Sequence, residues 1–83
     1  MNDQKDKLSM PYIANGWYRH YKGNCYLVFG IIWDCDTDCW KILYGIERPE
    51  YTRSYENFIE WIKVNEQFIP RFQRIKPQQG EPL

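Results

Sequence analysis

Apolar and polar residues alternate with a period of two in several short segments, which is the pattern of β-strands that bury one face. The alternation predicts strands over Trp17–Tyr21 and Trp40–Ile46. Between them, Cys25–Ile32 is almost entirely apolar, which indicates a central strand covered on both sides, and Gly30 marks a bulge or bend within it. Lys22-Gly23-Asn24 joins the first two strands as a hairpin turn, because glycine and asparagine readily adopt the backbone angles of such turns.

The second half of the chain predicts one short helix. Ser54 is a suitable N-cap for a helix over Tyr55–Trp61, because its hydroxyl accepts a hydrogen bond from a free amide of the first turn. The spacing of Phe58, Trp61 and Ile62 directs these side chains toward a core. A helix of about two turns does not hold in isolation, so we expect it to pack on the sheet.

Short extended segments surround this helix and complete the predicted sheet. Tyr51–Arg53 precedes the helix, and Asn65-Glu66-Gln67 forms a turn after it. The last strand is predicted over Pro70–Ile75 and at a sheet edge, because proline cannot donate a hydrogen bond to a neighbouring strand. Five short strands and one short helix predict a mainly β (α+β) fold, namely a small, strongly curved antiparallel sheet or half-open barrel.

The length of 83 residues allows one small domain. Residues 1–15 and 77–83 lack apolar periodicity, so we expect a flexible N-terminal tail and a C-terminal tail around a single β-rich domain at 16–76. The chain contains four Trp, seven Tyr and four Phe, and these large side chains give so small a domain enough apolar area to form a core.

Composition and charge argue against several classes of protein. No run approaches the ~20 apolar residues of a membrane-spanning helix, and the N-terminus has no apolar leader, so we expect a cytoplasmic protein with no membrane partner. The formal net charge is zero and the middle of the chain is acidic, which makes duplex DNA an unlikely partner, since duplex binders depend on many phosphate contacts. Three cysteines, an odd number, indicate reduced, partly buried thiols rather than a disulfide framework.

The segment Trp33–Cys39 contains three aspartates at alternate positions, as at the start of a calcium-binding loop. The sixth position from Asp34 is Cys39 instead of glycine, and the twelfth is Gly45 instead of a bidentate glutamate, so the calcium pattern is incomplete. A zinc site with Cys35, Cys39 and one His lacks a fourth ligand. We therefore expect a solvated hairpin loop in which Asp side chains cap backbone amides, and no metal or cofactor.

Cationic side chains from several segments form the candidate ligand-binding set. A domain of this size cannot keep them far apart, and we expect the site to contain Arg19, His20, Lys22, Tyr44, Arg53 and Arg71. Arginine offers a planar fork for a carboxylate or phosphate, and an aromatic ring beside it can stack on another flat ring. The alternative is that these cations only form surface ion pairs with nearby carboxylates, each contributing about 0 to 1 kcal/mol.

A catalytic role has less support than binding. His20 is the only side chain that titrates near neutrality without perturbation, and a pair with Cys25 is conceivable across the hairpin. A thiol at the start of a buried strand is usually inert, however. We therefore expect no enzyme.

Two segments carry longer motifs, Tyr18-Arg19-His20-Tyr21-Lys22-Gly23 and Pro70-Arg71-Phe72 with Ile75. With them the chain resembles a small bacterial and phage domain family of unknown function whose members read approximately YRHxKGxxYxV, HxET, a V-x-Y strand, WxRPxxxF and PRFxxI. The match continues in order through Tyr26, Val28, Thr37, Tyr44, Arg53, Phe58 and Glu60. Asp34 and Asp36 stand where the family has His and Glu, and Ser54 stands where it has Pro. The resemblance implies no activity, because the family has none assigned.

Together these residues favour a non-catalytic module for a small anionic ligand, of which a nucleotide is one class. Two protomers would enclose a ligand better than one short chain, so we expect a homo-oligomer. One form of this function is a phage protein that sequesters a nucleotide signal made by host defence. The alternative is a protein–protein adaptor or inhibitor with Trp, Tyr and Arg as interface anchors, and a weaker alternative is single-stranded nucleic-acid binding.

Overall fold

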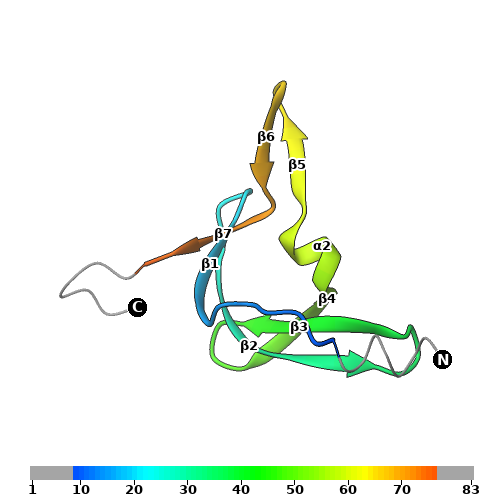
Figure 1. Ribbon diagram of the computed structural model, residues 1–83. Helices are drawn as coiled ribbons and strands as arrows, with labels where there is room; N and C mark the ends of the chain where they lie inside the picture. Colours follow the sequence, from blue (N-terminus) through cyan, green and yellow to red (C-terminus); the bar gives the residue numbers. More distant parts are fainter. Residues whose placement is uncertain (1–8, 77–83) are drawn as a thin grey trace.

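The structure, a computed structural model, describes residues 9–76 and is organised around one antiparallel sheet (Figure 1). The strands are β1 (Gly16–His20), β2 (Cys25–Asp34), β3 (Cys39–Gly45), β4 (Pro49–Ser54), β5 (Trp61–Val64), β6 (Gln67–Pro70) and β7 (Phe72–Ile75). Five of them form the sheet in the order β4-β3-β2-β1-β7, while β5 and β6 form a separate two-stranded hairpin. A short helix, α2 (Tyr55–Ile59), follows β4.

The mainly β, antiparallel fold predicted from the sequence is confirmed, and the sheet is open rather than closed into a barrel. β2 is the central strand of the five, as predicted, and β7 lies at an edge, as predicted for the last strand. Of the predicted tails, residues 1–8 and 77–83 lie outside the described residues. No helix within residues 9–76 has the length and hydrophobicity needed to cross a membrane.

Two predictions about the second half of the chain are wrong. The helix stops before Glu60, which already has extended backbone angles, so Trp61 begins β5 and is 61% exposed instead of facing a core. The chain also bends at Arg71, which separates β6 from β7 where one strand over Pro70–Ile75 is predicted. The Arg71 amide donates to the Glu60 carbonyl, and the Arg71 carbonyl accepts from the Tyr21 amide, so tertiary hydrogen bonds hold this corner.

The β2–β3 hairpin is longer than predicted, because β2 continues to Asp34 and only residues 35–38 turn. The predicted cap is confirmed: Asp34 accepts hydrogen bonds from the Asp36 amide and the Thr37 hydroxyl, both at 2.9 Å. These bonds, the one from Asp36 first, lower the pKa of Asp34, and Lys41 forms an ion pair with the same carboxylate at 3.3 Å.

A register shift in β2 confirms the bulge predicted at Gly30. Val28 pairs with Tyr44 and Gly30 pairs with the next residue along β3, so Phe29 is the extra residue. Because an extra residue reverses the alternation of side chains, Ile31 points to the same face of the sheet as Val28. We call this face, which also carries Tyr44, the inner face, and the opposite one the outer face.

The core lies on the inner face and is covered by α2 and by the segment 11–15. It consists of Tyr18, Val28, Ile42, Tyr44, Phe58 and Phe72. Phe58 of α2 is 1% exposed and stacks on Phe72 with 4.1 Å between ring centroids. The Tyr18 hydroxyl donates to the Ala14 carbonyl, and Ile13 packs against the core. Ile13 and Ala14, which lie within the N-terminal tail predicted over residues 1–15, therefore contact the rest of the domain.

Apolar side chains remain exposed outside this core. Phe29 and Ile32 of β2 are exposed, so this strand is covered on one side only, which corrects the prediction of a strand covered on both sides. The β5–β6 hairpin projects away from the sheet (Figure 1) and exposes Trp61 and Phe68. These two side chains share one face of the hairpin, because Lys63 pairs with Phe68 and has the same orientation as Trp61.

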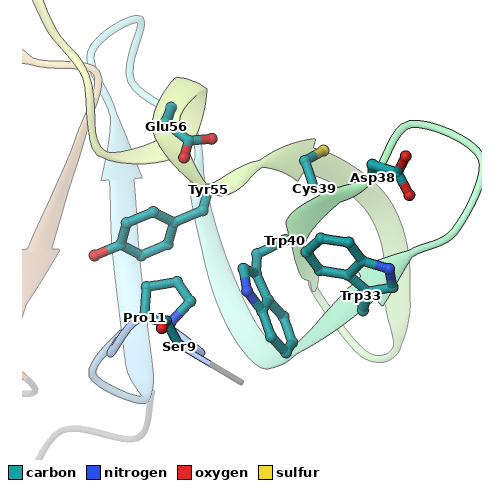
Figure 2. A pocket seen from close by; sticks show the side chains of 8 residues that line it. All are labelled: Ser9, Pro11, Trp33, Asp38, Cys39, Trp40, Tyr55 and Glu56. Atoms are coloured by element: carbon teal, nitrogen blue, oxygen red, sulfur yellow. The ribbon is translucent and has the colours of Figure 1, made fainter. Parts of the chain in front are cut away.

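A cleft of about 330 Å³ opens between the turn end of the β2–β3 hairpin and the start of α2 (Figure 2). Its aromatic walls are Trp33, Trp40 and Tyr55. Ser9, Pro11, Asp38, Cys39 and Glu56 complete the lining. Its lining contains none of the six residues predicted for the ligand-binding site.

Candidate functional site

Four of the six predicted ligand-binding residues lie together on the inner face, around the ring of Phe72 and the side of α2. They are His20, Tyr44, Arg53 and Arg71. The Phe72 ring contacts His20 and Tyr44, with centroids 4.9 and 5.3 Å apart, and the Arg53 guanidinium lies 5.3 Å from its centroid. Arg71 directly precedes Phe72 at the corner before β7. Residues from β1, β3, β4 and this corner thus converge.

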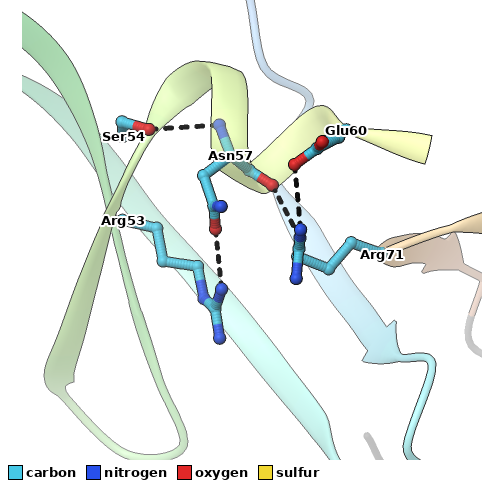
Figure 3. Close-up of polar contacts among 5 residues, drawn as sticks. All are labelled: Arg53, Ser54, Asn57, Glu60 and Arg71. Carbon is cyan, nitrogen blue, oxygen red and sulfur yellow. Dashed lines mark hydrogen bonds and ion pairs between the residues drawn. The ribbon is translucent and has the colours of Figure 1, made fainter. Parts of the chain in front are cut away.

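Arg53 is a half-buried cation at the centre of the cluster. Its Nε donates to the Tyr44 hydroxyl at 2.7 Å. Its Nη1 donates to the Asn57 side-chain oxygen at 2.7 Å, as Figure 3 shows. Both acceptors are neutral, and Arg53 forms no ion pair with any carboxylate in residues 9–76. Its remaining nitrogen, Nη2, has no acceptor in the same part of the chain. The positive charge of Arg53 is thus positioned but not neutralised.

Arg71 approaches the same asparagine from its other side. Its Nε donates to the Asn57 carbonyl at 3.0 Å, and its Nη2 pairs with Glu60 at 2.9 Å (Figure 3). The Asn57 amide in turn donates to the Ser54 hydroxyl at 3.1 Å, which confirms the predicted N-cap. The single turn of α2 therefore holds both guanidinium groups through one residue.

His20 lies beside these arginines with its imidazole held in one tautomer. The Lys22 amide donates to Nδ1 of His20 at 3.2 Å, so the proton of the neutral ring is on Nε2. Burial, followed by the positive charges of Arg53, Arg71 and Lys22, lowers the pKa of His20. The three positive charges that contribute to this shift give the region a positive potential, which favours an anion.

Tyrosine rings continue the cluster along the sheet. The Tyr26 ring meets Tyr44 and Tyr51 edge to face, with centroids 5.3 and 5.8 Å apart, and also contacts Phe72. Tyr51 is 51% exposed, which leaves part of its ring accessible at the margin of the cluster. An accessible aromatic ring near an arginine fork can stack on a second flat ring.

The other two predicted residues lie elsewhere. Arg19 pairs with Cys25 and Gln73 on the neighbouring strands, and the alternation along β1 places it on the outer face, opposite His20. Lys22 lies in the exposed turn, with its ammonium 5.8 Å from the Tyr21 ring. Since Cys25 shares the outer face with Arg19, the conceivable pair of Cys25 with His20 is not formed.

Surface ion pairs account for only part of the cationic set. Within residues 9–76 they join Arg71 to Glu60, Lys41 to Asp34 and Lys63 to Glu66.

The sequence prediction missed Asn57, Phe72, Tyr26 and Tyr51 as members of the cluster. For Asn57 a signal exists, because it is the third residue after the Ser54 N-cap, where the backbone amide points back to the cap.

Among residues 9–76, no three His, Cys, Asp or Glu side chains are arranged to hold a metal ion. Cys25, Cys35 and Cys39 are free thiols; Cys25 and Cys39 are partly buried, as predicted, whereas Cys35 is exposed. At the cluster, guanidinium and imidazole groups can donate hydrogen bonds to a ligand.

Comparison with solved structures finds a similar protein from Bordetella bronchiseptica, whose crystal structure is described as that of a DUF1653 protein. The two chains are 28% identical with a TM-score of 0.65, and the similarity covers 80% of this chain and 95% of the other. No curated protein matches. A comparison with protein families matches residues 16–74 and confirms the resemblance seen in the sequence motifs. The chain belongs to the family described as Protein of unknown function (DUF1653).

Proposed function

We propose that this protein is a non-catalytic module that binds a small anionic ligand at the cluster of His20, Arg53 and Arg71. The observation that carries the proposal is the state of Arg53, which is half-buried and has no carboxylate partner within residues 9–76. A cation that is partly removed from water without a counter-ion is costly, and a ligand anion removes that cost.

The donors around Arg53 suit a phosphate or carboxylate group. Nη2 of Arg53 and Nε2 of His20 have no acceptor among the described residues, and both are N–H donors. Charge-assisted hydrogen bonds from arginine to phosphate are roughly twice as strong as neutral ones. Asn57 and Tyr44 already orient the guanidinium, so less side-chain entropy is lost when the ligand binds.

A nucleotide is the ligand class that uses both parts of the cluster. Its phosphate would accept from Arg53 and His20, and its base would stack on the accessible ring of Tyr51 or Tyr26. In a homo-oligomer a second protomer would close this open site. Such a module acts by stoichiometric binding, and sequestration of a nucleotide signal of host defence by a phage protein is one setting for it.

Native mass spectrometry of protein purified gently from its producing cells tests the proposal, because it reports subunit number and retained ligand together. A discrete added mass of nucleotide size supports it and identifies the molecule. Calorimetric titration with nucleotides and cyclic nucleotides then measures affinity. Absence of any complex at high micromolar ligand contradicts the proposal.

A protein-binding module is the second candidate, favoured by the β5–β6 hairpin. Trp61 and Phe68 are 61% and 65% exposed on the same face of this projecting hairpin. Large aromatic side chains are the most frequent anchors of protein interfaces. A photo-crosslinking amino acid at position 61 should capture one discrete protein in cells, while the same residue at position 47, in the β3–β4 turn, should not.

A further inference from the structure

The cleft between the β2–β3 hairpin and α2 has two aromatic walls at nearly a right angle. Trp33 and Trp40 are direct partners across the hairpin. Their ring centroids are 5.3 Å apart and their planes are inclined by 75°. Because the edge of one indole meets the face of the other, the pair presents ring faces in two directions.

The opposite side of the cleft is formed by Tyr55 and Pro11. Figure 2 shows Tyr55 and Pro11 on one side of Trp40 and Trp33 on its other side, next to Asp38. The Tyr55 hydroxyl donates to the Tyr12 carbonyl at 3.0 Å, which fixes this ring to the N-terminal segment. Three aromatic side chains from three different segments therefore line one open cleft.

The charge of this cleft is opposite to that of the Arg53 cluster. Its lining contains two carboxylates, Asp38 and Glu56, and no Lys, Arg or His among the described residues. The nearby Lys41 pairs with Asp34 instead. Figure 2 shows Glu56 above Tyr55 and Asp38 above Trp33, at the two ends of the cleft. Carboxylates and aromatic ring faces both attract positive charge.

We propose that this cleft is a binding site for a quaternary ammonium group, such as that of choline. Such a cation has no N–H donor, so it needs no hydrogen-bond acceptor from the walls and is attracted by the negative faces of the rings. An unmethylated ammonium is strongly hydrated and would lose more on entering an aromatic space. The volume of about 330 Å³ lies near the lower end for ligand pockets and suits a small ligand.

The test separates charge from shape by comparing choline with 3,3-dimethyl-1-butanol, its neutral carbon analogue. Both are titrated into the full-length protein while the indole N–H signals are followed by NMR. We expect choline to shift the signals of Trp33 and Trp40 but not those of Trp17 and Trp61, and to bind about tenfold or more tightly than the alcohol. A peptide with trimethyl-lysine, titrated in parallel, distinguishes a free cation from a modified side chain as the source of the group.

Two conservative variants remove charge without removing volume. Asp38→Asn suits the fold, because Asp38 has a positive φ of 54°, a conformation that asparagine tolerates well. Together with Glu56→Gln it should weaken choline about tenfold and leave the alcohol unchanged. Glu47→Gln, at the other end of β3, is the matched control and should change neither.

Three results would overturn the inference. They are equal binding of choline and the alcohol, no shift of the Trp33 and Trp40 signals at saturating choline, or equal effects of Glu47→Gln and of the double variant Asp38→Asn with Glu56→Gln on choline affinity. None of them depends on the Arg53 cluster. The two sites are therefore tested separately, and failure at one leaves the other standing.

Discussion

Arg53 donates a 2.7 Å hydrogen bond to the hydroxyl of Tyr44, a residue of the neighbouring strand whose ring is buried in the core. The bond joins the apolar core to the cationic cluster. It gives the buried phenol the partner it needs, and it aims the arginine fork along the inner face.

Removing this hydroxyl is the most direct test of that link. Tyr44→Phe should lower the free energy of unfolding by about 1 to 3 kcal/mol, because Arg53 Nε loses its acceptor in a half-buried place. Thermal and denaturant unfolding measure the loss. Tyr51→Phe is the control, since the Tyr51 ring is exposed and its hydroxyl has no partner within residues 9–76, and it should leave stability unchanged.

Arg53→Lys keeps the charge of the cluster but removes the fork. A lysine ammonium cannot bond Tyr44, Asn57 and an anion in the same planar arrangement, so affinity for an anionic ligand should fall by about tenfold or more. Arg19→Lys makes the same chemical change on the outer face and should have no effect. Calorimetric titration of both variants with the ligand found in the native complex decides the matter, and equal affinities would remove Arg53 from the site.

Phe58→Ala should unfold most of the domain. Phe58 is almost completely buried, stacks on Phe72 and meets Tyr18 and Tyr44 edge to face. Loss of a buried phenylalanine costs about 3 to 5 kcal/mol, a large part of the stability of a domain this small. Circular dichroism and amide hydrogen exchange report the outcome. Ile59→Ala changes the neighbouring, exposed side chain and should cost much less.

The alternation of apolar residues was sufficient to predict most strands, because each buries one face on the core. The prediction of a helix from residue spacing failed at Trp61. The helical spacing continues through this residue, but the helix stops at Glu60, whose carbonyl accepts from the distant Arg71 amide. A hydrogen bond between segments eleven residues apart leaves no local signal in the sequence, so the end of α2 and the bend at Arg71 were both missed.

The candidate site was predictable to the extent that it depends on strand alternation. His20 and Arg19 must occupy opposite faces of β1, but the sequence does not say which face is open. Asn57 links Arg53 and Arg71, because it accepts a hydrogen bond from each, with its side chain and its carbonyl. That contact depends on how α2 sits on the sheet, and no motif encodes it.

Anion affinity should increase as the pH falls, through His20. In the free protein, burial and the neighbouring cations hold the pKa of His20 below its ordinary value of 6.5. A bound anion offsets those positive charges and raises the pKa of His20, so binding takes up a proton. Anion binding therefore becomes tighter as the pH falls below the pKa of the bound state, by at most about tenfold per pH unit.

Sulfate is a suitable probe for this dependence, because its charge is constant between about pH 8 and about pH 5, the range in which histidine titrates. Titration calorimetry in buffers of different ionisation heat measures both affinity and proton uptake. His20→Asn keeps an acceptor for the Lys22 amide but cannot titrate, so its affinity for sulfate should be nearly independent of pH. If the variant and the natural protein show the same pH dependence, the proton is taken up elsewhere and His20 does not contact the anion.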